Sequence, residues 1–492
     1  MCAAVAAGSS AVAQGDPVRE ITWADLTPLR SSLEAHGLTA DGFPAYLQRL
    51  RDTHAARVRD GDFDHLVFYL LQSRHFTSQP PLEPALSAKA LVEGLPEAER
   101  VSFLGGAPLD ASRVPAPVRA RIAALVKALD APRGDARLLY FGELTKSAGA
   151  DQTQRAASIG REYLRAMRFV YQKEFVAQRS AKPAEAVAGL YRSRGLSTDT
   201  AVEAGYLVSI GLGILKSLSP DVAVRRILIV GPGLDLAPRT ALVEVGPPES
   251  YQPWAVIDAL VATGLAKLGD LEVVGADINP RVVSHLRRAH DAPPTLDLVS
   301  EIRDTESISL TPEYREYFAN LGRAIADGNT AARPPAAPEG HLRKRIRVSR
   351  SAATALAAER LDIVTDRLTG APFDLVIATN ILPYFDDDEL TLAMTNVSSM
   401  LAPGGFFLHN EARPSLDRIS RAVGLTFEQS RHVVIANVRG APAPLFDSVW
   451  LHRKVTRGAS SLGLPYSLAR GGPNAPLRSP GSLAALVRAA SR

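Results

Sequence analysis

The spacing of apolar residues divides the chain into two parts, and the first reads as helical. From residue 20 to about 200, apolar positions recur at helical spacing, as in "VPAPVRARIAALVKALDAP" (residues 114–132). A further helix is predicted in "STDTAVEAGYLVSIGLGILKSLSP", with Ser197 or Thr198 as its cap and Pro220 after its end. This part is expected to form a mainly helical domain.

The pattern changes at Arg225, where short apolar runs begin to alternate with helical segments. Strands alternating with helices predict a parallel, doubly wound α/β sheet. The last two apolar runs are joined by the short segment "RGAPAP", which predicts a hairpin at one edge of the sheet. The expected strands are "RRILIVG", "LEVVGADI", "RLDIV", "FDLVIATN", "GGFFLHNE", "RHVVIANV" and "FDSVWLHRK".

These patterns predict four segments. They are residues 1–19, a leader or disordered N-terminus; 20–200, a helical domain; 201–455, an α/β domain; and 456–492, a disordered tail rich in Gly, Ser, Pro and Ala. Apolar residues make up 46% of the chain and charged residues 22%, the balance of a globular protein. No apolar run is long enough to predict a membrane span. The net charge of +4 gives no strong nucleic-acid signal.

The first residues leave the location of the protein open. Ala11-Val12-Ala13 before Gln14 has the small-x-small form of a signal-peptidase site, but a basic start is missing. One interpretation is the end of a signal peptide, with export to the periplasm; the other is an irregular N-terminus. The single cysteine, Cys2, excludes disulfides and multi-cysteine zinc sites, and no metal site is expected.

A glycine-rich turn follows the first strand of the α/β part. Gly231 and Gly233 allow close approach of a ligand, and Asp277 at the tip of the next strand is placed to bind ribose hydroxyls. Together they predict an adenosine-containing cofactor. A dinucleotide turn needs a glycine where Leu236 stands, followed here by Pro238, so pyrophosphate binding is disfavoured.

From Ile227 to about Glu411 the chain resembles class I S-adenosylmethionine-dependent methyltransferases. The likeness is carried by "FDLVIATNILPYFDDDELTLAMTNVSSMLAPGGFFLHNE", and over residues 341–411 it is closest to the methyltransferases of chemotaxis receptors. Those enzymes have motifs matched here by Asn380, Tyr384 and Phe385, and by His409, Asn410 and Glu411. In the first motif, however, Asp235 replaces a glycine and Ile229 replaces an acid. Thr379 stands where the receptor enzymes have arginine, so receptor methylation is not implied.

The resemblance implies a Rossmann-like doubly wound sheet of the class I methyltransferase type and S-adenosylmethionine as cofactor. Asp235 is a hypothetical partner of the cofactor's ammonium group, and Asp366 is expected near the adenine edge. The expected cofactor-binding residues are Gly231, Gly233, Asp235, Asp277, Ile278, Asp366 and Asn380. No catalytic residue is assigned; the candidates are His409, Tyr384 and Glu411.

Three functions remain open. The first is a cytoplasmic methyltransferase acting on a small molecule or a protein. The second is a non-catalytic protein that keeps the fold as a binding scaffold, which is compatible with export, and the third is an NAD-type oxidoreductase. The basic segment 341–350 is expected to be a solvated strand or loop, and "DDDE" at 386–389 a helix cap. Neither the acceptor nor the oligomeric state follows from the sequence.

Overall fold

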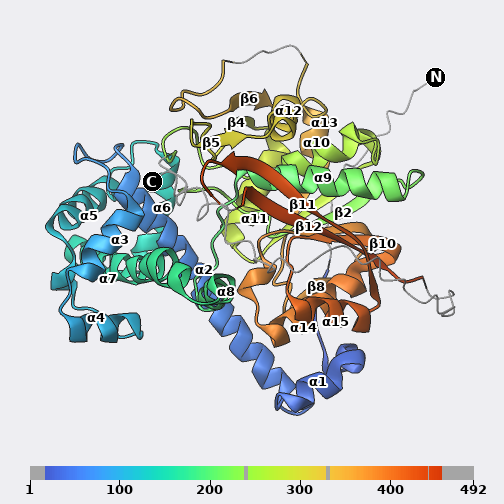
Figure 1. Cartoon of the computed structure of the whole chain (residues 1–492), viewed down its shortest axis with the longest axis horizontal. Helices are drawn as coiled ribbons and strands as arrows, with labels where there is room; N and C mark the ends of the chain where they lie inside the picture. The colour runs from blue at the N-terminus through green and yellow to red at the C-terminus, as the bar shows by residue number, and fades with distance from the viewer. Residues whose placement is uncertain (1–16, 238–241, 329–332, 442, 457–492) are drawn as a thin grey trace, which may run out of the picture.

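The computed structural model describes residues 17–237, 242–328, 333–441 and 443–456. Figure 1 shows the long helix α2 running from α1 to a group of helices beside a large sheet. The strands are β1 (Val18–Glu20), β2 (Arg226–Val230), β3 (Glu272–Asp277), β4 (Thr295–Val299), β5 (Ile308–Leu310), β6 (Arg343–Arg347), β7 (Leu356–Arg360), β8 (Asp366–Leu368), β9 (Phe373–Ala378), β10 (Leu401–His409), β11 (Leu425–Val438) and β12 (Leu445–Lys454).

The main sheet has eight strands in the order β5-β11-β12-β10-β9-β2-β3-β7. The five strands from β10 to β7 are parallel, whereas β12 is antiparallel to β10 and β11 is antiparallel to β12. The predicted doubly wound sheet and its terminal hairpin are thus confirmed, although β5 lies outside the hairpin. From β2 the chain builds first toward β7 and then, from β9, in the opposite direction. A ligand crevice is expected at this reversal, beyond the carboxyl ends of β2 and β9.

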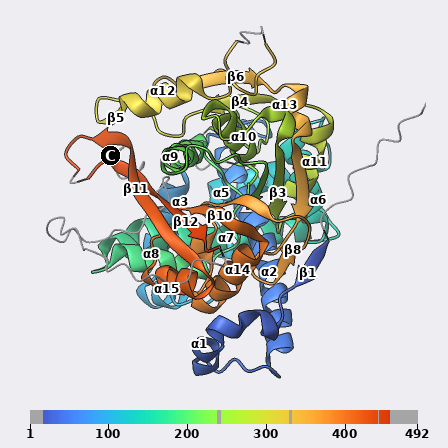
Figure 2. The same ribbon diagram turned by 90° about the vertical axis from the view of Figure 1, so that its right-hand side faces the viewer.

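Helices cover both faces of the sheet. Along β2, Ile227 and Ile229 join one apolar core, while Leu228 and Val230 join another, as the twofold alternation of a strand requires. Figure 2 shows α9 and α10 on one side and α14 and α15 on the other. The covering helices are α9 (Val202–Leu218), α10 (Gln252–Ala262), α11 (Pro280–Asp291), α12 (Pro312–Asn320), α13 (Arg350–Thr354), α14 (Asp387–Met400) and α15 (Pro414–Ala422).

The N-terminal half is mainly helical, as predicted. Its central helix, α2 (Phe43–Gln72), is buried on all sides from Gly61 to Gln72, because other helices surround it. The other helices are α1 (Arg30–Ala35), α3 (Pro84–Glu93), α4 (Glu97–Leu104), α5 (Ala116–Leu129), α6 (Ala136–Lys146), α7 (Gln152–Tyr171) and α8 (Pro183–Arg192). Apolar residues between Ile21 and Leu50 belong to the second core of the sheet, so this half also packs directly on the α/β part.

Two local predictions are wrong. Helix α9 begins at Val202 after the N-cap Ala201, and the expected caps Ser197 and Thr198 lie outside it. Instead, Thr198 pairs with the glycine turn, where its hydrogen bonds replace those of a helix. The strand expected at "RLDIV" is β7, which lies earlier and ends at Arg360. The predicted leader and tail lie almost wholly outside the described residues, among which no helix is long and apolar enough to cross a membrane.

Candidate cofactor site

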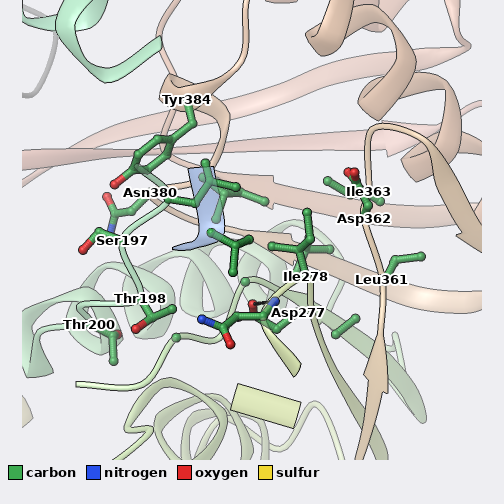
Figure 3. A pocket seen from close by; sticks show the side chains of 18 of the residues that line it. Ser197, Thr198, Thr200, Asp277, Ile278, Leu361, Asp362, Ile363, Asn380 and Tyr384 are labelled. Atoms are coloured by element: carbon green, nitrogen blue, oxygen red, sulfur yellow. Dashed lines mark hydrogen bonds between the residues drawn. The ribbon is translucent and has the colours of Figure 1, made fainter. Parts of the chain in front are cut away.

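A cavity lies at the carboxyl ends of β2, β3 and β9, where the strand order reverses. Its empty volume is about 830 Å³, part of it open to solvent. Figure 3 shows Asn380, Tyr384 and Ser197 on one side, with Leu361, Asp362 and Ile363 on the other. The lining comes from α2, from 196–200, from the glycine turn with Gln252, from 276–279, from 361–363 and from 379–385.

The glycine turn forms the floor of the cavity, and both glycines are required there. Gly231 and Gly233 have φ angles of +65° and +74°, which favour glycine. A Cβ on Gly233 would lie 2.6 Å from the carbonyl oxygen of Thr198. Thr198 is fixed in this place because its carbonyl accepts from the N–H of Leu234 at 2.8 Å, and its hydroxyl donates to the Leu234 carbonyl at 2.9 Å. A segment from the N-terminal half therefore covers the turn.

Asp277 ends β3 beside the glycine turn, and the structure brings it to the cavity as expected. Its Oδ1 accepts a hydrogen bond from the N–H of Asn279 at 2.8 Å. Burial raises the pKa of Asp277 to about 7, against hydrogen bonds from the backbone N–H groups of Asn279 and Gly233. The neighbouring Ile278 also lines the cavity. A buried carboxylate at this place can accept hydrogen bonds from ligand hydroxyls.

Asn380 follows β9 in a strained conformation at the cavity wall. Its φ is +62°, a value that non-glycine residues rarely adopt. Asn410 holds it in place: the Asn380 N–H donates to Oδ1 of Asn410 at 2.9 Å, and Nδ2 of Asn410 donates to Oδ1 of Asn380 at 2.7 Å. Nδ2 of Asn410 also donates to the half-buried Asp447. Such conformations are concentrated at functional sites, and Asn380 lines the cavity. Its role in cofactor binding stays a prediction.

Helix α2 supplies a wall of the cavity that sequence reasoning missed. His54 lies with Nδ1 2.7 Å from Oδ2 of Asp362 and Nε2 3.0 Å from Oε1 of Glu389. Although burial opposes the charge, the two carboxylates raise the pKa of His54 to about 9. The polar run "GDFDH" (residues 61–65) in the apolar end of this helix indicated that α2 has buried polar partners, but His54 itself lies outside that run.

Tyr384 also lines the cavity. Of the three catalytic candidates, it alone is found among the described lining residues. Its ring meets that of Tyr191 edge-on at a centroid distance of 5.4 Å. The guanidinium of Arg57 lies 5.9 Å from the Tyr384 ring and donates to the Tyr384 carbonyl at 3.0 Å. Arg57 also donates to the carbonyls of Tyr191 and Arg194. The part of α2 that carries His54 and Arg57, called the α2 wall below, thus fixes the loop that carries Tyr384.

The other two catalytic candidates lie away from the cavity lining. His409 is fully buried in β10, where Nε2 lies 3.1 Å from Nδ1 of His452, and burial holds its pKa well below the ordinary value. Glu411 accepts from the N–H of Arg413 at 3.0 Å. Arg413 in turn donates to the carbonyls of Leu382 and Phe385. Glu411 thus supports the loop that carries Tyr384 through Arg413, whereas His409 is held between β10 and β12.

Two expected cofactor residues are also displaced from the cavity. Asp366 lies in β8, which pairs with β1, and its carboxylate accepts from Arg51 at 3.1 Å. Because β7 ends at Arg360, Asp362 takes the place expected for Asp366. Asp235 lines a neighbouring hollow instead, since its N–H donates to the carbonyl of Glu249 and turns the chain away. Burial, reinforced by Asp199, raises the pKa of Asp235 to about 7.

The acidic run at 386–389 is a helix cap, as predicted. Oδ1 of Asp386 accepts from the N–H groups of Asp388 at 3.0 Å and Glu389 at 2.8 Å, and Glu389 completes a capping box. Within the described parts of the chain, no group of three or more His, Cys, Asp or Glu side chains could hold a metal ion. The basic segment forms the strand β6, which pairs with β4.

No family model and no curated protein matches the chain. Solved structures that do match include TrmN from Thermus thermophilus, with 13% identity, 50% of this chain, 49% of TrmN and a TM-score of 0.26. The N-methyltransferase NodS from Bradyrhizobium japonicum WM9, in complex with S-adenosyl-L-homocysteine, matches with 14% identity, 58% of this chain, 97% of NodS and a TM-score of 0.26. The glycopeptide N-methyltransferase MtfA, complexed with S-adenosyl-L-methionine, has 9% identity, 51% and 94% coverage and a TM-score of 0.27.

TM-scores this low do not indicate a function. The chain aligns with about half of the length of TrmN. The fold is assigned from the sheet itself. Five parallel strands reverse their order between β2 and β9, and the antiparallel β12 is inserted between β10 and β11. The chain therefore has a Rossmann-like doubly wound sheet of the class I methyltransferase type, with an N-terminal region that is mainly helical.

Proposed function

We propose that the protein is an S-adenosylmethionine-dependent methyltransferase. The observation that carries the proposal is the meeting of the glycine turn and Asp277 in one cavity at the strand-order reversal. Gly231 and Gly233 let the backbone approach a ligand, and Asp277 supplies a buried acceptor for ribose hydroxyls. The acceptor is a small molecule or a protein, and the likeness to chemotaxis-receptor enzymes stays a prediction.

The charges around the cavity favour this cofactor over a dinucleotide. Three carboxyl side chains, those of Asp199, Asp277 and Asp362, are among the lining residues, and none of the described lining residues is Lys or Arg. The positive charge of His54, which also lines the cavity, is shared between Asp362 and Glu389. A pyrophosphate would face these acids at a turn where Leu236 is 1% exposed and packed into the core. S-adenosylmethionine carries a positive sulfonium and no phosphate, so it suits the acidic lining.

When bound, S-adenosylmethionine supplies a methyl group already activated by the positive sulfur. The protein then has to position the acceptor and exclude water. Asp277 would hold the ribose, and Asp362 lies on the side of the cavity where the adenine edge is expected. Tyr384 and Ser197 lie on the opposite side, where their polar groups can orient an acceptor, and Asn380, the expected cofactor-binding residue, lies beside them (Figure 3). The proposal assigns no general base.

Calorimetric titration of the purified chain with S-adenosylmethionine tests the proposal. We expect binding in the micromolar range that is lost in Asp277→Ala. Asp270→Ala, which removes an exposed Asp just before the same strand, is the matched control and should bind like the wild type. A well-folded sample without binding would leave the non-catalytic scaffold, and binding of NADH instead would support the oxidoreductase. A mature N-terminus at Gln14 in an extracytoplasmic fraction would also favour the scaffold.

A further inference from the structure

Helix α2 binds both rims of the cavity through side chains one turn apart. His54 faces Asp362 on one rim, and Arg57 donates to the carbonyl of Tyr384 on the other. Residues three apart lie on the same face of a helix, so the two contacts belong to one surface of α2. This surface lies in the N-terminal half, outside the cofactor motifs.

The contacts of His54 fix its protonation state. Each ring nitrogen lies within hydrogen-bond distance of a carboxylate oxygen, 2.7 Å for Asp362 and 3.0 Å for Glu389. Carboxylates only accept hydrogen bonds, so both nitrogens must carry a proton and the ring is an imidazolium. The ring is 1% exposed, and such a buried charge persists only with partners of opposite sign.

Of the two acids that pair with His54, Asp362 is the one found among the described lining residues of the cavity. Its Oδ2 faces His54, and its Oδ1 accepts from the N–H of Val364 at 3.1 Å. Glu389 lies on the other side of the ring, where its Oε2 accepts from the N–H of Asp386 at 2.8 Å. Asp362 is thus held between a helix of the N-terminal half and a loop after β7.

We propose that His54 is a positioning residue for nucleoside binding: its imidazolium, shared between Asp362 and Glu389, holds the Asp362 carboxylate at the cavity wall, where it receives a donor group of the ligand's base. The inference rests on the proposed function, because it takes an adenine-bearing ligand for granted. It makes the N-terminal half part of the binding site.

The test measures binding of adenosine and S-adenosylhomocysteine by calorimetry, because adenosine reports on the nucleoside end alone. We expect His54→Gln to weaken both by about tenfold, within the range of coupling energies between contacting residues. His36→Gln is the matched control: His36 also pairs with an acid near the start of α14, Asp388 at 2.7 Å, but on the surface. It should change neither affinity.

A double-mutant cycle separates positioning from a general loss of structure. If His54 acts through Asp362, then His54→Gln combined with Asp362→Asn binds no more weakly than Asp362→Asn alone. Additive losses, or a His54→Gln variant with wild-type affinity, would overturn the inference while leaving the proposed function intact. A folded wild type that binds neither ligand would instead overturn the proposed function, and the inference with it.

If His54→Gln does not fold, a second variant can test the role of His54. Glu389→Gln keeps the imidazole but removes one of its two carboxylates, so that Asp362 is the acid that still pairs with the ring. Arg57, which lies 4.0 Å from Glu389, is the nearby cation on the same helix. The ring should lose its proton at lower pH than in the wild type. We expect the ratio of adenosine affinities, wild type over variant, to rise between pH 7 and about 9. A constant ratio would overturn the inference.

Discussion

Two of the buried regions that contain histidine have opposite environments. In the α2 wall, His54 lies between two carboxylates; in the seam between β10 and β12, His409 lies beside His452 and the Trp450 ring. Their exposures are nearly equal, at 1% and 0%. The pKa of His54 is nevertheless raised to about 9, whereas that of His409 is held well below its ordinary value.

The difference shows that partners, rather than burial, decide what a buried histidine does. Burial disfavours the charged ring in both regions, and only the carboxylates of Asp362 and Glu389 reverse its effect in the α2 wall. In the seam, a neutral ring packs as an aromatic side chain. We therefore expect the two regions to respond differently to substitution and to pH.

The largest expected effect is on stability. His54→Leu leaves the buried Glu389 and the half-buried Asp362 without their shared cation and should lower the free energy of unfolding by about 3 kcal/mol. His409→Leu removes a neutral ring whose partners, His452 and the N–H of Glu411, are uncharged, and should lower it by about 1 kcal/mol. Urea denaturation of both variants at pH 7 measures the two values. Equal losses would contradict the contrast between the regions.

The two regions should also respond to pH in opposite directions. The folded pKa of His54 lies above 6.5, so its stabilisation is complete below pH 6.5 and is lost as pH rises through about 9. The pKa of His452 is lowered to about 4, so the seam loses stability as pH falls from 6.5 through about 4. Denaturation curves from pH 4 to 10 measure both losses of stability. The loss at high pH should be absent in His54→Gln, and the loss at low pH should be smaller in His452→Phe.

The sequence predicted the sheet better than the wall that completes the site. The apolar runs at β2, β3 and β9, with Gly231, Gly233 and Asp277 at their ends, are local patterns, and the structure keeps them together. His54 meets Asp362 across more than three hundred residues, and no local spacing indicates such a pair. His409 belongs to the family motif that ends at Glu411, but its burial depends on β12, which pairs with β10 from a later part of the chain.

A smaller effect on stability is expected where the segment of Thr198 covers the glycine turn. It tests how closely the N-terminal half packs against the site. Gly233→Ala combines a left-handed backbone with a Cβ 2.6 Å from the Thr198 carbonyl, and should destabilise the protein by about 2 kcal/mol or more. Gly264→Ala has a φ of +67° but open space around the new methyl group. It should cost only about 1 kcal/mol of backbone strain. Thermal unfolding compares them, and equal shifts would show that the cover is not tight.

The smallest expected effect concerns ligand affinity and a buried acid on the sheet side of the cavity. Because burial raises the pKa of Asp277 to about 7, its carboxylate form is gained as pH rises through 7. We expect S-adenosylhomocysteine affinity to increase several-fold, up to about tenfold, between pH 6 and 8. Asp277→Asn should bind more weakly and lose most of this dependence. Equal pH profiles of the two proteins in calorimetry would exclude Asp277 as the titrating group.

A crystal structure of the protein grown with S-adenosylhomocysteine tests the central claim most directly. The account predicts the ligand in the cavity above Gly231 and Gly233, with its ribose hydroxyls on Asp277 and its base toward Asp362. Ligand bound elsewhere on the chain, or an empty cavity in crystals that hold a saturating concentration, would contradict it.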